Sequence, residues 1–215
     1  MHASSYQFRL CLNPDCGLRY PLSEKNAFGE RCPACLGETI VVAERARDQE
    51  RRRSTPSAPR GNRPRAVLDN IRSALNVGSM FRTAEGYGFG HLYLCGVTPT
   101  PEDPKVRKTA LGAEALLGWS AHKNAVTLVS TLKGSGDSVW ALERTSQSQA
   151  LETALRRASP GENLVLVVGN EQAGVDPAIL ELADQVVHLE MVGAKRSFNV
   201  AVAFAIAAHA MCSGA

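Results

Sequence analysis

The clearest hydrophobic pattern lies in the last fifty residues of the chain. Leu164–Val168 is a continuous apolar run closed by Gly169, the pattern of a strand buried on both faces. A second short strand is predicted at Val186–Met191. Asp176 and Pro177 between them suit the N-cap and first position of a helix.

A polar loop follows the second strand and leads to Ser197 and Asn199, which head a strongly apolar helix. Earlier in the chain, apolar residues at 77, 80, 81 and 84 predict one face of a helix with Asn76 as its N-cap. The other predicted elements are strands at 65–70, 91–97 and 139–143 and helices at 105–115, 124–132 and 148–158. This alternation predicts an α/β fold with several parallel strands.

Two loops of this predicted sheet carry polar and small residues that suit a ligand site. In open α/β sheets, ligands bind outside the carboxyl ends of the strands. The two loops offer Gly169, Asn170, Glu171 and Gly174, then Ser197 and Asn199. Because glycine lets a ligand approach the backbone closely, the pattern predicts a small-molecule pocket here.

Composition is that of a globular protein, with 215 residues, 44% of them hydrophobic and 21% charged. The longest apolar segment, Val200–Ala208, is too short to span a bilayer. The first ten residues lack the basic head and apolar core of a signal peptide. We therefore expect a soluble cytoplasmic protein.

The net charge of +3 is unevenly distributed. Residues 44–65 hold eight arginines and three acids, whereas residues 66–215 hold twelve basic and fourteen acidic side chains. Residues 43–64 are predicted to form a basic Arg/Pro-rich linker. Arginine clusters of this kind bind nucleic-acid phosphates, although a solvated spacer is the other reading of this segment.

Four cysteines lie in two pairs near the N-terminus: Cys11, Cys16, Cys32 and Cys35. Their spacing predicts a tetrahedral zinc site with four thiolate ligands. The alternatives are disulfides, which a chain without an export signal disfavours, and four unrelated thiols. Residues 1–42 resemble a zinc ribbon whose folding would depend on the metal. Cys95 and Cys212 stand apart and are expected to be ordinary buried cysteines.

Three segments resemble the motifs of a known family. DNIRSALNVGSMFRTAEGYGFG, LVLVVGNEQAGV and HLEMVGAKRSFNVAVAFAIA are similar, in this order, to the three motifs of the SpoU family, the TrmH-like branch of the SPOUT RNA methyltransferases. The resemblance implies S-adenosylmethionine (AdoMet) as methyl donor and 2′-O-ribose methylation of tRNA or rRNA. It also implies a homodimer and a C-terminal trefoil knot, whereas periodicity alone predicts an unknotted sheet.

The resemblance assigns roles residue by residue within a methyltransferase domain at 65–215. The implied catalytic residues are Asn76, Arg82, Glu171, Ser197 and Asn199. The implied cofactor-binding residues are Gly169, Asn170, Glu171, Gly174, Leu189, Met191, Ser197 and Phe198. Arg82 would hold the phosphate beside the target ribose.

Taken singly, these residues also have structural explanations. Asn76 and Ser197 suit helix caps, and Glu171 suits a cap or an ion pair with Arg82. Two other functions are therefore kept as alternatives: a catalytically silent RNA-binding protein that retains this fold, and an enzyme with a different ligand in a doubly wound fold. The presence of both Arg82 and Glu171 argues against the silent protein.

Overall fold

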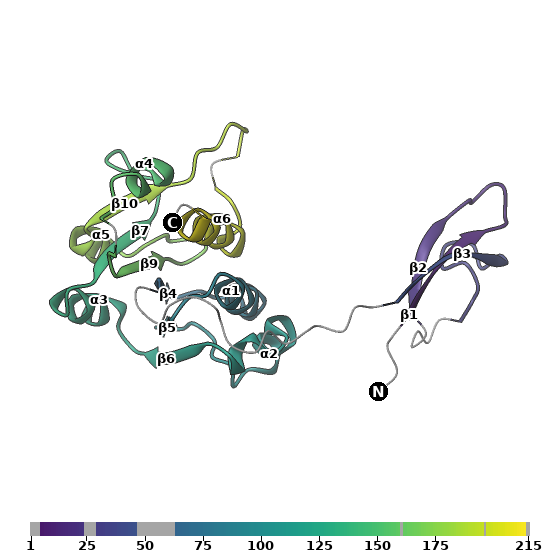
Figure 1. The fold of residues 1–215 in the computed structure, drawn as a ribbon, viewed down its shortest axis with the longest axis horizontal. Helices are drawn as coiled ribbons and strands as arrows, with labels where there is room; N and C mark the ends of the chain where they lie inside the picture. Colours follow the sequence, from purple (N-terminus) through teal and green to yellow (C-terminus); the bar gives the residue numbers. More distant parts are fainter. Residues whose placement is uncertain (1–4, 24–28, 47–62, 160, 196, 214–215) are drawn as a thin grey trace. The chain divides into compact units, whose positions relative to one another are not determined.

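The structure is a computed structural model that describes residues 5–23, 29–46, 63–159, 161–195 and 197–213 (Figure 1). The chain divides into two compact units, Met1–Pro56 and Ser57–Ala215. Most of the predicted linker, residues 47–62, lies outside the described residues. In the described part of the chain, no helix is long and apolar enough to cross a membrane.

The N-terminal unit contains a three-stranded antiparallel sheet in the order β2-β1-β3. Its strands are β1 (Ser5–Cys11), β2 (Arg19–Ser23) and β3 (Thr39–Ala46). Strand β3 thus runs past residue 42, where the sequence placed the end of the ribbon. Two turns, one after β1 and one before β3, carry the four paired cysteines.

The C-terminal unit is built on a seven-stranded sheet in the order β6-β5-β4-β9-β7-β10-β8, with every strand pair parallel. The strands are β4 (Arg65–Asp69), β5 (His91–Cys95), β6 (Gly118–His122), β7 (Ser138–Leu142), β8 (Gln149–Ala150), β9 (Leu164–Val168) and β10 (Gln185–His188). The chain runs from β4 outward to β6 and then crosses to the other side of β4. The junction between β4 and β9 is therefore where the direction of winding reverses.

Helices cover both faces of this sheet, in agreement with the prediction that the strand Leu164–Val168 is buried on both faces. Figure 1 shows α3 and α5 on one side and α1, α2 and α6 on the other. Alternate residues of strand β9 point into two hydrophobic cores, one on each face of the sheet. Leu166 and Val168 pack with α1 and α6, whereas Val165 and Val167 pack with α3 and α5. The helices are α1 (Ala74–Gly86), α2 (Pro104–Ala110), α3 (Ala125–Gly134), α4 (Leu151–Leu155), α5 (Pro177–Leu182) and α6 (Val200–Ser213).

The apolar pattern located the central elements well. The predicted strand Leu164–Val168 is confirmed as β9, and Asp176 caps α5 as expected. The predicted face of α1, with Val77, Met80, Phe81 and Ala84, is buried. The trefoil knot stays a prediction.

Four predictions about elements were wrong. The helix expected at 105–115 ends at Ala110, because Leu111 and Gly112 have positive φ, and a short 3₁₀ turn follows at Ala113–Ala115. The helix expected at 148–158 is reduced to α4, because Gln149 and Ala150 pair with β10. Strand β10 stops at His188, short of Met191. Strand β6 was missed, since an edge strand reading Gly-Trp-Ser-Ala-His shows no apolar run.

Helices α1 and α2 cross closely because Gly78 lies at their contact. A Cβ atom added to Gly78 would lie 1.9 Å from Thr109 Oγ1 and 2.4 Å from the backbone oxygen of Val106. The Val106 oxygen belongs to the backbone and cannot withdraw without moving α2. Any side chain at position 78 would therefore push the two helices apart.

We expect Gly78→Ala to lower the free energy of unfolding by about 1–3 kcal/mol, the usual effect of overpacking. Gly86→Ala is the matched control: it lies in the same helix, and nothing surrounds its Cβ position within 4 Å. That change should be neutral or slightly stabilising. Urea unfolding followed by fluorescence of Trp119 and Trp140 would measure both, and equal effects would contradict the packing argument.

Candidate functional site

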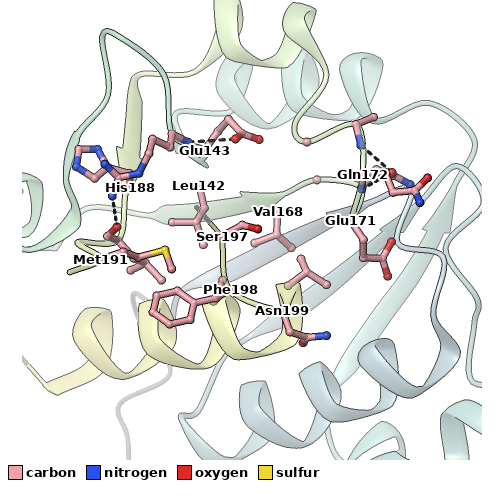
Figure 2. A pocket seen from close by; sticks show the side chains of 18 residues that line it. Leu142, Glu143, Val168, Glu171, Gln172, His188, Met191, Ser197, Phe198 and Asn199 are labelled. Atoms are coloured by element: carbon pink, nitrogen blue, oxygen red, sulfur yellow. Dashed lines mark hydrogen bonds between the residues drawn. The ribbon is translucent and has the colours of Figure 1, made fainter. Parts of the chain in front are cut away.

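A pocket of about 380 Å³ opens at the carboxyl ends of β7, β9 and β10 (Figure 2). Its floor includes Leu142 and Val168, the last residues of β7 and β9. The start of α6 forms another wall, where Figure 2 shows Phe198 near Met191 and Glu171 on the opposite side. A pocket therefore lies at the two loops where the sequence predicted one, next to the junction between β4 and β9.

The loop after β9 is a tight turn closed on itself. Asn170 and Gly174 exchange two backbone hydrogen bonds of 3.0 and 2.9 Å. Gly169 is required here, because an added Cβ would lie 2.2 Å from the Gly174 oxygen. Gly174 has φ of +77°, a conformation that favours glycine. The turn leaves the side chain of Glu171 projecting from its tip toward α1.

The carboxylate of Glu171 is anchored at the N-terminus of α1. Its oxygens accept hydrogen bonds from the backbone N–H of Arg72 at 2.9 Å, from that of Ser73 at 3.1 Å and from Asn76 Nδ2 at 3.0 Å. Burial acts to raise the pKa of Glu171, but these donated hydrogen bonds outweigh it and the net pKa is lowered. The carboxylate is therefore favoured over the protonated form. Among the described residues, Glu171 does not form the ion pair with Arg82 that the sequence left open.

Asn76 joins this anchor to the start of α6. Asn199 Nδ2 donates to Asn76 Oδ1 at 3.2 Å, while Asn199 Oδ1 accepts from the backbone N–H of Ala201 at 2.9 Å. Two cap predictions were wrong: Ser73 caps α1 in place of Asn76, and Asn199 occupies the cap position of α6 in place of Ser197. Asn76, Glu171 and Asn199 thus link the loops of all three sequence motifs.

Arg82 lies outside this pocket. It lines a separate hollow on the α1–α2 surface, together with Lys108 and Leu111. Its side chain is exposed, and no hydrogen bond or ion pair joins it to another described residue. Of the five residues with implied catalytic roles, the structure brings Asn76, Glu171, Ser197 and Asn199 together and leaves Arg82 apart.

All eight residues with implied cofactor roles line the pocket: Gly169, Asn170, Glu171, Gly174, Leu189, Met191, Ser197 and Phe198. The lining residues that sequence reasoning missed include Glu143, Arg144 and His188. Glu143 Oε2 accepts from the Val175 N–H at 3.0 Å, and Arg144 Nη2 donates to the Leu189 oxygen at 2.6 Å. Their position at the carboxyl ends of β7 and β10 was the signal that could have found them.

The four paired cysteines of the N-terminal unit form a second candidate site. Their Sγ atoms all lie within 4.8 Å of one another. The Cys11–Cys35 separation is 3.4 Å and the Cys16–Cys32 separation is 3.7 Å. A tetrahedral zinc ion with Zn–S bonds of about 2.3 Å holds its sulfurs about 3.8 Å apart. The arrangement therefore fits one zinc ion, and these separations are too long for disulfides.

Backbone amides of the two turns donate to sulfur atoms of this cluster, and the pKa shifts of the thiols differ in direction. Burial raises the pKa of the Cys11 thiol to about 12, although the N–H of Asn13 donates to its sulfur. The N–H of Gly37 lowers the pKa of Cys35 to about 7. Such N–H···S contacts orient and stabilise thiolate ligands of a bound cation.

The sequence and the fold were compared with known proteins. Residues 63–209 match the SpoU rRNA Methylase family. A 23S rRNA (guanosine(2553)-2'-O)-methyltransferase of Bacillus subtilis is 32% identical over 146 residues, which are 65% of this chain and 54% of that protein. A tRNA (guanosine(18)-2'-O)-methyltransferase of Escherichia coli is 24% identical over 139 residues, 65% of this chain and 58% of that protein. The chain thus spans about half the length of the curated relatives it matches.

Solved structures share the fold. An AdoMet-bound rRNA methyltransferase from Sinorhizobium meliloti superposes with a TM-score of 0.66 and 22% identity, covering 73% of this chain and 58% of that one. A SpoU methyltransferase from Streptomyces viridochromogenes, solved with AdoMet, has a TM-score of 0.63 and 21% identity, covering 83% and 69%. At these identities the likeness establishes the α/β fold with its parallel sheet.

The anchor at α1 predicts how stability depends on pH. Because the pKa of Glu171 is lowered by folding, its carboxylate stabilises the protein above the unfolded pKa, and this contribution is lost as pH falls through the folded value. Glu171→Ala should cost about 0.5–1 kcal/mol at pH 7, since solvent screens an exposed cap. The difference from wild type should shrink below about pH 4.

Urea unfolding of wild type and variant at several pH values measures this difference. Glu181→Ala is the control, because Glu181 is an exposed glutamate on α5 away from the α1 N-terminus. A pH-independent difference for Glu171→Ala would contradict the carboxylate anchor.

Proposed function

Because the chain belongs to the SpoU rRNA methylase family, we propose that it transfers a methyl group from AdoMet to a ribose 2′-OH of tRNA or rRNA. The observation that carries this proposal is the pocket beside β9, lined by all eight residues with implied cofactor roles. Relatives named as 2'-O-methyltransferases support the ribose as acceptor. They also disfavour a catalytically silent RNA-binding protein, since those relatives are enzymes.

The pocket suits AdoMet in size and chemistry. Its volume of about 380 Å³ lies within the range of small-molecule sites, about 300–1,000 Å³. Leu189, Met191 and Phe198 would pack against the adenine ring, and the turn from Gly169 to Gly174 would approach the cofactor through its backbone. AdoMet, when bound, supplies a methyl group on a sulfonium centre that is already activated for transfer.

The acceptor ribose needs orientation more than a strong base. The Glu171 carboxylate already accepts three hydrogen bonds at α1, so we assign it to holding the two loops together. A guanidinium with a pKa above about 12 does not take a proton, so we assign Arg82 to holding the phosphate beside the ribose. Ser197 and Asn199 lie at the pocket wall and would orient the hydroxyl groups.

A homodimer with shared sites would explain the position of Arg82. In one chain, the groove between Arg82 and the cofactor pocket runs along α1 and α6 and includes Asn76, Ser79 and Asn199. This groove presents apolar side chains to solvent, with Val202 47% and Ile206 37% exposed. A second copy packed on this face would cover them and bring the Arg82 of each subunit to the pocket of the other.

The N-terminal unit would serve as an RNA-binding accessory held together by zinc. Cys11, Cys16, Cys32 and Cys35 would ligate one structural zinc ion, which supplies folding energy to a unit with little core of its own. The basic linker would add contacts to RNA phosphates. A cytoplasmic location belongs to the same proposal.

Ribose methylation is the direct test of the proposed function. Mass spectrometric mapping of rRNA and tRNA from cells with and without the protein should reveal at least one 2′-O-methyl nucleotide that depends on it. Purified protein should bind AdoMet in calorimetry and methylate RNA lacking that mark. A protein that binds RNA but not AdoMet would instead be the silent relative.

The zinc site predicts one zinc per chain in protein purified under reducing conditions. Cys32→Ser should reduce this content and unfold the N-terminal unit, because three thiolates bind zinc less tightly. AdoMet binding should persist, since the pocket lies within Ser57–Ala215. Cys95→Ser is the control, as Cys95 lies outside the cluster, and metal-free protein in elemental analysis would refute the site.

Mixed dimers test whether sites are shared. Arg82→Ala retains an intact pocket, whereas Gly169→Val disrupts the turn after β9 and retains Arg82. Each variant alone should be inactive. With random reassortment at equal amounts, half of the dimers are mixed and have one complete site of two, so about a quarter of wild-type activity should return. A mixture that stays inactive, with mixed dimers confirmed, would show that each chain builds its own site.

A further inference from the structure

The hollow that contains Arg82 has features that phosphate positioning by one arginine does not explain. It has a volume of about 530 Å³ and lies between α1 and the C-terminal end of α2. The residues that line it are Ser79, Arg82, Thr83, Lys108, Thr109 and Leu111. None of them is acidic, and none belongs to the cofactor pocket.

Two positively charged side chains line this hollow, and no acidic side chain lines it. Arg82 comes from α1 and Lys108 from α2, and both side chains are exposed. Neither forms an ion pair with a described residue: in that part of the chain, the ion pairs lie elsewhere. Because like charges repel, a fold that brings them together favours an anion between them.

The close crossing of the two helices enforces this arrangement. Gly78 and Arg82 are four residues apart and share one face of α1. Gly78 contacts Thr109, the residue after Lys108. Arg82, one turn further along α1, therefore lies next to the end of α2. The packing of the two helix backbones thus sets the positions from which the side chains of Arg82 and Lys108 enter the hollow.

Leu111 supplies the second unusual feature. It ends α2 with φ of +53°, a conformation that usually costs a non-glycine residue about 1–2 kcal/mol. Its backbone N–H donates to the Arg107 oxygen at 3.1 Å and closes the helix. Its side chain, in contrast, is 65% exposed and gains little from burial. An exposed leucine in the same hollow as two cations suits a ligand that has an apolar surface next to its negative charge.

We propose that Arg82, Lys108 and Leu111 form a nucleotide subsite for the substrate RNA. Arg82 and Lys108 hold a backbone phosphate, and Leu111 packs against the ribose or base attached to it. Lys108 is thereby a positioning residue that extends RNA contact along α2. The inference rests on the proposed RNA substrate and identifies a second element, α2, that recognises it.

Salt-dependent binding separates this subsite from general surface charge. The probe is a fluorescein-labelled single-stranded RNA of mixed sequence, followed by anisotropy at several salt concentrations with full-length protein. Lys108→Gln should weaken binding on the order of fivefold and reduce the slope of log affinity against log salt by about 0.7. Lys108→Arg should retain both values. Lys105→Gln is the matched control, because Lys105 is exposed on the same helix but does not line the hollow.

Leu111→Gly separates binding from folding. Glycine relieves the positive φ but makes the unfolded chain more flexible, which offsets part of the gain, so the variant should unfold at the same or a slightly higher urea concentration than wild type. It should still bind the RNA more weakly, with an unchanged salt slope, because an apolar contact and not a charge is lost. Unchanged RNA affinity in this variant would show that Leu111 makes no contact with RNA.

Two outcomes would overturn the subsite, and neither depends on methyl transfer. If Lys108→Gln and Lys105→Gln lowered RNA affinity equally, the two lysines would contribute only non-specific surface charge. Displacement of the RNA by poly-glutamate at equal charge would point to an acidic protein as partner. If the RNA results hold but wild type methylates no RNA, the proposed function fails while the subsite stands. Where methylation is measured, Lys108→Gln should raise KM for RNA and leave kcat and AdoMet affinity unchanged.

Discussion

The anchoring of the Glu171 carboxylate at the N-terminus of α1 is the contact on which the site depends. It joins the loop after β9 to the loop after β4, the two strands where the winding of the sheet reverses. A second tie runs in parallel, from Asn170 Nδ2 to the Asn70 oxygen at 2.7 Å. Helix N-termini favour negative charge, so an ionised glutamate holds both halves of the crevice in one arrangement.

The two ligands that we propose, AdoMet and RNA, would bind at different parts of the domain. The cofactor pocket is built from loops at the carboxyl ends of β7, β9 and β10, whose geometry the buried sheet fixes. The cations that we propose for RNA, Arg82 and Lys108, lie on the surface of α1 and α2. Helix α1 takes part in both, since its first turn carries Asn76 and its third carries Arg82. This rigid helix fixes the position of Arg82 relative to Asn76 within one chain.

Particular residues explain what sequence reasoning predicted and what it missed. Strand β9 was placed correctly because burial on both faces requires an uninterrupted apolar run. Strand β6 was not predicted, because a strand at the edge of the sheet does not need an uninterrupted apolar run. The helix predicted at 105–115 continued through Leu111, since nothing in a leucine signals a positive φ. Glu143 and Arg144 were not predicted as pocket residues, because they border the pocket only once β7 pairs with β10 in the folded sheet.

The sequence by itself determined the βα alternation, the central strands, the paired cysteines and, through its motifs, the loops that line the pocket. These features depend on local spacing, which periodicity and glycine positions report directly. Only the tertiary structure decided that Ser73 and Asn199 cap the helices, that Glu171 anchors α1, and that Arg82 lies beside Lys108 and away from the pocket. The two caps are local contacts, and the sequence offered a second polar residue close to each of them. The contacts of Glu171 and the position of Arg82 join residues on different elements. Their partners are set by how the elements pack, which no local pattern encodes.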